Sequence, residues 1–205
     1  MIRVEDQGNC RTITLARPEK ANALTEPMLQ GIAAAVRQTT ARVLILTGEG
    51  KVFSAGADLD GMRDGLGLSS AWEAASGAIA AFPGLSIAAL NGTLAGGAMG
   101  TALACDIRIA VPAANFFYPV MRLGYRPQPS DPARLAALIG PSRSRMILLA
   151  GQRIDAETAL SWGLIDRICE PSSLMDTAMS LAEHALAADP GHVAALKRMT
   201  NGNTP

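Results

Sequence analysis

The chain opens with two short segments in which apolar and polar residues alternate. They span residues 2–6 and 11–16, and Gly8 and Asn9 lie between them. A period of two is typical of strands with one buried face, and a Gly-Asn pair suits the tight turn that joins two antiparallel strands. The sequence therefore predicts a β-hairpin at the start of the chain.

A helix and a buried strand are predicted next. Thr25 is placed to cap the helix, Pro27 falls in its first turn, and apolar residues recur at spacings of three and four from Met28 to Val36. Residues 43–47 form a continuous apolar run, which is typical of a strand covered on both faces. Strand, helix and buried strand in this order predict an α/β layer architecture.

The same pattern extends along the rest of the chain. A helix stopped by Pro83 and Gly84 is followed by two more buried strands, with a helix of small residues between them. The later segments are mostly helical, and Ser142 and Asp155 are the predicted caps. The predicted helices are 70–81, 98–104, 143–150, 156–162 and 173–188, and the predicted strands are 86–90, 107–111 and 164–168.

Charge is balanced over the whole chain, with 18 basic and 18 acidic side chains. This balance gives no reason to expect nucleic acid or an anionic membrane as a partner. Residues 74–105 include no charged side chain, but glycine, proline and asparagine divide them into pieces too short to cross a bilayer of roughly 30 Å. We expect this segment to be buried interior and predict no membrane span.

The cysteines and the first residues indicate the compartment. The charged amino-terminal residues do not fit a secretory signal. Cys10, Cys105 and Cys169 are widely spaced and include no CxxC pair, which suits reduced thiols better than a disulfide framework or a zinc site. We therefore expect a cytoplasmic protein with no bound metal.

Several common catalytic motifs are missing from the sequence. No GxSxG turn is present, and His184 and His192 fall in the helical carboxy-terminal part, so a serine hydrolase is not expected. The GEGK at 48–51 lacks the spacing of a phosphate-binding loop, and the glycine pair at 96–97 lacks the GxGxxG order of a dinucleotide fold. No nicotinamide cofactor is predicted.

Two glycine-bearing turns remain as candidate chemistry. FSAGADL at 53–59 and NGTLAGGAMG at 91–100 each follow a buried strand and lead toward a helix. Such turns leave backbone N–H groups free, and two converging turns would hold a carbonyl oxygen that becomes anionic during a reaction. Either turn alone is also compatible with a tight packing junction.

The sequence resembles the enoyl-CoA hydratase/isomerase, or crotonase, superfamily from about residue 4 to residue 199. The resemblance implies an α/β fold, a crotonase-like spiral of ββα units with a shortened helical carboxy-terminal portion. It divides the chain into an acyl-CoA-binding core, 1–170, and a helical segment, 171–205, that is either part of the same domain or a region for trimer contacts. The resembling segments are RPEKANAL (17–24), ILTGEGKVFSAGADL (45–59), IAALNGTLAGGAMGTALACDIRIA (87–110) and LLAGQRIDAETALSWGLIDRI (148–168).

The resemblance also implies the ligand and its contacts. The ligand would be an acyl-CoA thioester, with no cofactor beyond the coenzyme A of the substrate, and the protein would be a homotrimer or a dimer of trimers. The backbone N–H groups of Ala57 and Gly97 would form the oxyanion hole for the thioester carbonyl. The residues assigned to coenzyme A binding are Lys20, Ala21, Ala23 and Ala55, with Asp58 and Leu59 in the same loop.

The chain departs from the family at two positions that serve hydration. Hydratases of the family carry one glutamate three residues after the oxyanion glycine, where this chain has Gly100. They carry a second after the proline of FFYP, where this chain has Val120. Because neither side chain can transfer a proton, a two-glutamate hydratase is not expected. The chain is also short after residue 168, which implies altered trimer contacts and pocket closure.

Asp131 is the best remaining candidate for an acid/base. It lies in the segment 124–135, which replaces a glycine-rich turn beside the acyl pocket, and one carboxylate there would serve double-bond migration. The position most similar to the aspartate of some relatives holds Gln128. Asp131 directly precedes Pro132, so it would also serve as a plain helix cap. Tyr118 and Glu73 are weaker candidates, expected to be a strand-end aromatic and a solvated helix charge.

Two functions are compatible with these residues. The first is an enzyme of acyl-CoA metabolism that stabilises a thioester enolate, as an isomerase or an atypical hydratase. The second is a catalytically silent protein that binds acyl-CoA for another protein. The missing glutamates favour the second more than composition alone does.

Overall fold

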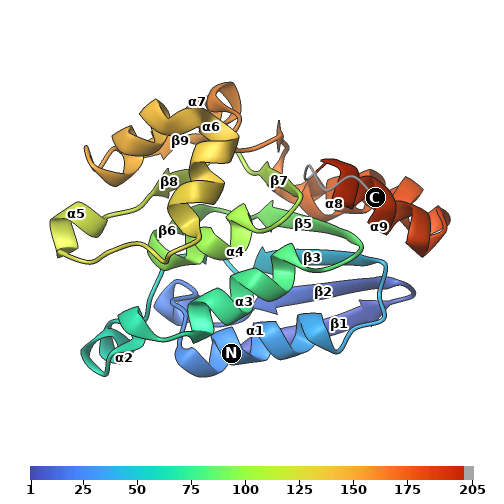
Figure 1. The fold of residues 1–205 in the computed structure, drawn as a ribbon, viewed down its shortest axis with the longest axis horizontal. Helices are drawn as coiled ribbons and strands as arrows, with labels where there is room; N and C mark the ends of the chain where they lie inside the picture. Colours follow the sequence, from blue (N-terminus) through green and yellow to red (C-terminus); the bar gives the residue numbers. More distant parts are fainter. Residues whose placement is uncertain (201–205) are drawn as a thin grey trace.

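The computed structural model describes residues 1–200, which form two β-sheets enclosed by helices (Figure 1). The larger sheet contains, in spatial order, β1 (Ile2–Gln7), β2 (Cys10–Leu15), β3 (Val43–Gly48), β5 (Leu85–Leu90), β7 (Ile107–Ala110) and β10 (Arg167–Ile168). The smaller sheet contains β4 (Val52–Ser54), β6 (Thr93–Ala95), β8 (Asn115–Phe117) and β9 (Ile154–Asp155). The last part of the predicted helical segment 171–205, residues 201–205, lies outside the described residues.

The first two strands form the predicted hairpin. β1 and β2 are antiparallel, with Ile2 opposite Leu15 and Gln7 opposite Cys10. Gly8 in the connecting turn has φ 58°, a left-handed conformation that glycine adopts without steric cost. β2 then pairs in parallel with β3, so the hairpin forms one end of the larger sheet.

Repeated ββα units build most of the two sheets. In each unit one strand joins the larger sheet, the next strand joins the smaller sheet, and a helix follows. Units pair in parallel, β3 with β5 and β5 with β7 in one sheet, and β4 with β6 and β6 with β8 in the other. This arrangement is the predicted spiral. It brings the carboxyl ends of β4 and β6 side by side, and with them the two glycine-bearing turns.

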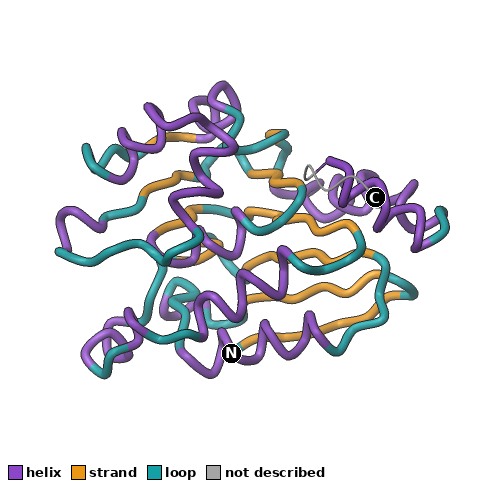
Figure 2. Tube along the Cα trace, in the orientation of Figure 1, coloured by secondary structure: helices purple, strands orange, loops and turns teal. Residues whose placement is uncertain are grey.

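Helices cover the sheets, and Figures 1 and 2 show α1 and α3 running side by side across one face of the larger sheet. α8 contacts the central strands β3, β5 and β7. The Thr25 hydroxyl accepts a hydrogen bond from the Met28 N–H at 3.4 Å, which confirms the predicted cap of α1. The α-helices are α1 (Glu26–Arg37), α2 (Leu59–Arg63), α3 (Ala71–Ala80), α4 (Met99–Leu103), α5 (Val120–Leu123), α6 (Asp131–Leu148), α7 (Ala156–Trp162), α8 (Leu174–Ala187) and α9 (Pro190–Thr200). Short 3-10 helices are η1 (Pro18–Lys20), η2 (Leu66–Leu68), η3 (Gly96–Ala98) and η4 (Pro171–Ser173).

The central strands are buried along almost their whole length. Residues 43–46 of β3 and 86–90 of β5 are all buried, as expected for strands covered on both faces. The uncharged segment 74–105 supplies much of α3, all of β5 and all of α4 to the core, which confirms that it is interior. None of the helices in residues 1–200 combines the length and the apolar character needed to cross a bilayer.

Three predicted boundaries are wrong. The helix predicted at 143–150 begins two residues early, because α6 is broken at Gly140, which has φ 79° and ψ 161°, and its second part starts at Pro141 instead of following a Ser142 cap. Pro141 resumes the helix directly afterwards, a position that tolerates its missing N–H. The small-residue helix is split into η3 and α4, and the strand predicted at 164–168 shrinks to Arg167–Ile168.

Candidate active site

The two glycine-bearing turns touch through their backbones. A Cβ atom on Gly56 would lie 3.0 Å from the Ala95 carbonyl oxygen and 3.3 Å from the Gly96 Cα. Gly56 and Gly96 also have φ values of 100° and 56°, a region that favours glycine. The predicted convergence of the segments 53–59 and 91–100 is therefore confirmed, and the close approach depends on the absence of side chains there.

The Ala57 amide points away from the strand-like contact that holds its loop. The Leu24 N–H donates to the Gly56 carbonyl at 2.7 Å, and the Asp58 N–H donates to the Leu24 carbonyl at 2.9 Å. Because successive N–H groups of an extended segment point in opposite directions, the Ala57 N–H faces away from Leu24. Ala57 lines a pocket on that side.

Gly97 lines the same pocket, whose volume is about 370 Å³. It is the second residue of η3, and the first N–H groups of a helix have no acceptor within that helix. Among residues 1–200, neither the Ala57 amide nor the Gly97 amide donates a hydrogen bond. The structure thus brings two free backbone donors to one cavity.

Trp72 on α3 forms the wall behind Gly97. Its indole Nε1 donates to the Leu66 carbonyl at 2.8 Å, which fixes the ring. A Cβ atom on Gly97 would lie 3.0–3.3 Å from three ring carbons, so the indole and the glycine backbone are in direct contact. Sequence reasoning missed Trp72, since nothing in the pattern distinguishes it from an ordinary core aromatic.

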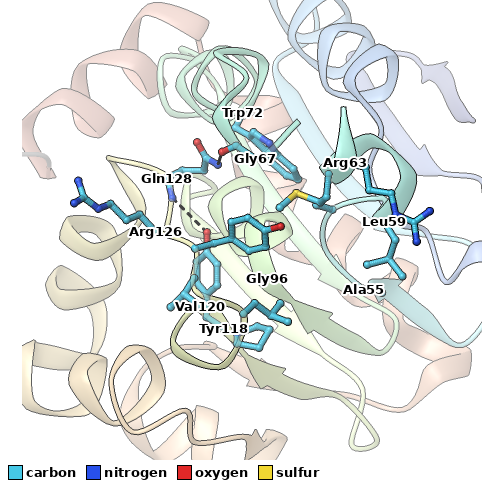
Figure 3. A pocket seen from close by; sticks show the side chains of 16 residues that line it. Ala55, Leu59, Arg63, Gly67, Trp72, Gly96, Tyr118, Val120, Arg126 and Gln128 are labelled. Atoms are coloured by element: carbon cyan, nitrogen blue, oxygen red, sulfur yellow. Dashed lines mark hydrogen bonds between the residues drawn. The ribbon is translucent and has the colours of Figure 1, made fainter. Parts of the chain in front are cut away.

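The pocket wall is mostly apolar. Figure 3 shows Leu59, Trp72, Tyr118 and Val120 around the pocket, while the Arg126 guanidinium points away from it. Within the described part of the chain, no aspartate or glutamate lines the pocket. A carboxylate that acts on a ligand there must do so from behind the wall or through another side chain.

Asp131 lies behind the wall, at the start of α6, and is only 1% exposed. Its Oδ2 accepts a hydrogen bond from the Tyr118 hydroxyl at 2.9 Å, whereas its Oδ1 has no partner among residues 1–200. Burial raises the pKa of Asp131 to about 6, although the Tyr118 hydrogen bond and the Arg134 charge act in the opposite direction. No side chain caps α6, so the interpretation of Asp131 as a helix cap is wrong.

The Asp131 carboxylate fills the space beside Gly100. A Cβ atom on Gly100 would lie 2.5 Å from Asp131 Oδ1 and 3.1 Å from its Cγ. A side chain at position 100 would therefore force the Asp131 carboxylate to shift. Gly100, the position where the resemblance implies a hydratase glutamate, is bordered here by a carboxylate from a different element.

Tyr118 connects this carboxylate to the pocket. It follows β8, lines the pocket and is 4% exposed. Its hydroxyl donates to Asp131 and accepts a hydrogen bond from the Gln128 N–H at 3.4 Å, drawn as the dashed line in Figure 3. Burial and the neighbouring Asp131 charge raise the pKa of the phenol. Sequence reasoning underrated Tyr118, because its link to Asp131 is a tertiary contact.

Glu73 was predicted to be a solvated helix charge, and this prediction is wrong. Its carboxylate accepts hydrogen bonds from both the backbone N–H and the hydroxyl of Ser130, each at 3.0 Å. Ser130 is the residue before α6. Glu73 on α3 therefore holds the start of α6, and with it Asp131, in place.

The residues assigned to coenzyme A binding lie around the loop 17–24. The Ala55 N–H donates to the Ala21 carbonyl at 2.9 Å, which joins this loop to the 53–59 turn. Ala55 and Leu59 line the pocket, whereas Lys20 and Ala23 do not. The structure thus brings part of the assigned set to the cavity and leaves the rest on the adjoining loop.

Asn22 shapes this loop and was missed by sequence reasoning. It is buried with φ 53°, a conformation that asparagine tolerates better than most residues. Its amide donates to the Glu49 and Val52 carbonyls at 2.9 and 2.8 Å, and its Oδ1 accepts from the Arg17 N–H at 2.8 Å. The side chain replaces backbone pairing where the loop leaves the sheet.

The Asp58 side chain is used entirely within the protein. One oxygen pairs with the Arg17 guanidinium at 2.5 Å, and the other accepts from the Asp60 and Gly61 N–H groups at 3.1 Å. The Arg17 guanidinium holds the pKa of this carboxyl below its usual range. Asp58 therefore joins the 17–24 loop to the start of α2, and only its backbone remains available to a ligand.

The cysteines and histidines are dispersed. Cys10, Cys105 and Cys169 are free, and His184 and His192 are exposed on α8 and α9. Within residues 1–200, no group of three His, Cys, Asp or Glu side chains is arranged to hold a metal ion.

Comparisons with known proteins identify the family. The family model for enoyl-CoA hydratase/isomerase matches residues 5–204. Probable enoyl-CoA hydratase echA6 of Mycobacterium tuberculosis is 33% identical over 171 residues, covering 82% of this chain and 70% of that protein. Carnitinyl-CoA dehydratase of Salmonella arizonae is 35% identical over an alignment of 213 residues, covering 97% of this chain and 79% of that protein.

Solved structures show the same fold. The crystal structure of an enoyl-CoA hydratase/isomerase from Pseudoalteromonas atlantica superposes with a TM-score of 0.91 and 28% identity, covering 98% of this chain and 82% of that one. An enoyl-CoA hydratase from Bacillus anthracis gives a TM-score of 0.89 at 30% identity, covering 98% and 83%. The predicted crotonase-like α/β fold is confirmed, and the chain belongs to the enoyl-CoA hydratase/isomerase family.

Proposed function

We propose that this protein binds an acyl-CoA thioester and stabilises its enolate, acting as an isomerase-like enzyme rather than a two-glutamate hydratase. The observation that carries the proposal is the pair of free N–H groups, on Ala57 and Gly97, at one apolar cavity. An enolate oxygen is best stabilised by preorganised donors in a site that excludes water, where one donor contributes on the order of 2.7–4 kcal/mol.

Asp131 is the proposed acid/base. Its pKa is raised to about 6, close to neutral pH, where a group can both accept and return a proton. One such group suffices for double-bond migration, because the proton removed from one carbon is delivered to another. Hydration instead needs a group that activates water, and neither Gly100 nor Val120 supplies one.

The names of the relatives support the ligand class. Both an enoyl-CoA hydratase and a carnitinyl-CoA dehydratase are named for CoA thioesters. We place coenzyme A along the 17–24 loop and the 55–59 turn, with backbone contacts from Lys20, Ala21, Ala23, Ala55, Asp58 and Leu59. A homotrimer or dimer of trimers, which rests on the family alone, and a cytoplasmic location, which rests on the widely spaced cysteines, complete the proposal.

The test is exchange of the α-protons of a saturated thioester, butyryl-CoA, in D₂O, together with conversion of 3-enoyl-CoA to 2-enoyl-CoA. Both need the enolate and neither needs added water. Gly97→Val is expected to abolish productive thioester binding and both reactions, because its side chain collides with Trp72 and displaces the donor. Gly77→Ala is the control, since a Cβ atom there meets nothing within 4 Å.

A catalytically silent acyl-CoA-binding protein is the second candidate. The specific observation in its favour is that no carboxylate in the described part of the chain lines the pocket. It predicts binding of short, medium and long acyl-CoA without α-proton exchange for any of them. Exchange that depends on Gly97 would exclude this candidate.

A further inference from the structure

We propose that Tyr118 is the catalytic residue that exchanges a proton with the bound thioester, and that Asp131 stores that proton behind it. This inference rests on the proposed function and adds to it the group that touches the substrate. It assigns the two residues different roles. Tyr118 contacts the ligand, and Asp131 acts only through Tyr118.

The first reason is access. Asp131 is 1% exposed and does not line the pocket, whereas Tyr118 does. The two oxygens are 2.9 Å apart, a normal hydrogen-bond length. Tyr118 is therefore the polar side chain through which Asp131 reaches the cavity.

The second reason is that Asp131 is held away from the pocket. Its Oδ1 packs against α4 at Gly100, and the residue before it is bonded twice to Glu73. Gln128 is anchored as well, since its side chain donates to the Gly67 carbonyl at 3.2 Å. The carboxylate has no free segment of chain that would carry it forward to a ligand.

The charged groups around Asp131 are few. Glu73 comes from α3 and Arg134 from α6 itself, and their charges act on it in opposite directions. The facing helix α4 has no charged residue. Asp131 is thus a buried carboxylate whose proton affinity is set mainly by burial and whose direct hydrogen-bond partner is the Tyr118 hydroxyl.

The proposed step is balanced within the site. The C2–H bond of the thioester breaks and its proton moves to the Tyr118 oxygen, while the Tyr118 proton moves to Asp131 Oδ2. The C2 electron pair shifts into the thioester carbonyl, and the resulting anion is held by the Ala57 and Gly97 N–H groups. In the return step on a 3-enoyl thioester, Asp131 gives its proton back to Tyr118, and Tyr118 delivers one to C4 of the dienolate. The C3=C4 π electrons form the new C4–H bond, the enolate electrons restore the thioester carbonyl, and the double bond ends between C2 and C3. No oxidant, reductant or water is consumed.

The experiment compares Tyr118→Phe with Asp131→Asn, with Asp176→Asn on α8 as the control for a surface charge. Butyryl-CoA affinity is measured by calorimetry, and α-proton exchange in D₂O is followed by NMR between pH 4.5 and 8. We expect each variant to lose on the order of 100-fold or more in exchange rate while binding within a few-fold of the wild-type protein. The double variant is expected to be no slower than either single one.

The pH profile separates this role from a structural one. In the wild-type protein, exchange should rise as Asp131 ionises and level off above its pKa of about 6. The residual rate of Asp131→Asn should lack this rise, and Asp176→Asn should retain it.

A measurement on the wild-type protein covers the case in which a variant does not fold. Tritium release from C2-labelled butyryl-CoA is compared in H₂O and D₂O. The relay moves the exchangeable Tyr118 proton in the same step, so release should be slower in D₂O. Direct removal by Asp131 moves only the carbon-bound hydrogen, and equal rates in the two solvents would overturn the relay.

Failure of the relay differs from failure of the proposed function. If Tyr118→Phe keeps its exchange while Asp131→Asn loses it, Asp131 acts directly, the relay is wrong and the proposed function stands. If Asp131→Asn keeps its exchange while Tyr118→Phe loses it, the storage role is wrong. If the wild-type protein binds butyryl-CoA and exchanges no proton, both the proposed enzymatic function and the relay are wrong.

Discussion

At the scale of single residues, the site depends on side chains that are missing. Gly56 and Gly96 let two turns touch, Gly97 lies against an indole ring, and Gly100 leaves room for a carboxylate. In the last case, a carboxylate from one element occupies the space that a side chain on another element would need. The family position that would carry a glutamate is empty of side chain, and Asp131 fills the space from another helix.

The pairing of Gly100 with Asp131 predicts a coupled effect on stability. Gly100→Ala should lower the free energy of unfolding by about 1–3 kcal/mol, because its Cβ would lie 2.5 Å from Asp131 Oδ1. In the Asp131→Ala background the same change should cost much less, which gives a coupling of about 1–3 kcal/mol in a double-mutant cycle by urea unfolding. Gly77→Ala, in open space on α3, should instead stabilise by about 0.5–1 kcal/mol. Additive effects of Gly100→Ala and Asp131→Ala would contradict the contact.

Burial of Asp131 predicts the pH dependence of stability. Its pKa is raised from 3.8 to about 6. Above pH 6 the folded state therefore contains a buried charged carboxylate, which lowers the free energy of unfolding. Below about pH 4 the carboxyl is protonated in both states and the penalty disappears. The wild-type protein should therefore gain stability relative to Asp131→Asn as the pH falls from 6 to 4, by up to about 1.4 kcal/mol per pH unit. Parallel curves for the two proteins in urea unfolding would show that the pKa is not raised.

At the scale of elements, the site is assembled where ββα units meet. Parallel pairing of β4 with β6 places the two turns at one edge of the smaller sheet. The 17–24 loop is tied to the first turn by backbone bonds and by the ion pair between Arg17 and Asp58. Loss of that pair should loosen the loop on which coenzyme A binding is proposed to depend.

Asp58→Asn tests this connection. Asparagine can still accept the hydrogen bonds from the N–H groups at the start of α2, so the change removes mainly the charge pair with Arg17. In that pair, the Asp58 side chain is 11% exposed and the Arg17 side chain is 18% exposed. We expect a loss of about 2–3 kcal/mol in the free energy of unfolding, below the 3–5 kcal/mol typical of a fully buried pair, and weaker acyl-CoA binding.

The matched control is Asp60→Asn, which breaks the pair between Asp60 and Arg63. These side chains are 78% and 82% exposed, so the change should lower the free energy of unfolding by less than about 0.5 kcal/mol. Equal effects of the two variants on unfolding and affinity would show that the ion pair between Arg17 and Asp58 does not hold the loop.

At the scale of the whole molecule, the sequence predicts those helices, strands and turns that short-range residue patterns determine. The hairpin at Gly8, the Thr25 cap and the buried strands follow from residues close together in the chain. The contacts that complete the site join distant residues, such as Glu73 to Ser130 and Tyr118 to Asp131. No spacing rule reports these contacts, and Asp131 before Pro132 has the local pattern of a cap. The two converging turns could be predicted because a family resemblance supplied the long-range information.

The central claim is that the Ala57 and Gly97 amides together polarise a thioester carbonyl. Infrared difference spectroscopy of butyryl-CoA with ¹³C at the carbonyl tests it most directly, because the isotope shift isolates that one band in the bound complex. The two donors should move the C=O stretch to a lower frequency than in water, with a smaller shift or none in any complex that Gly97→Val still forms. A thioester bound to the wild-type protein with its carbonyl band at the position found in water would contradict the claim.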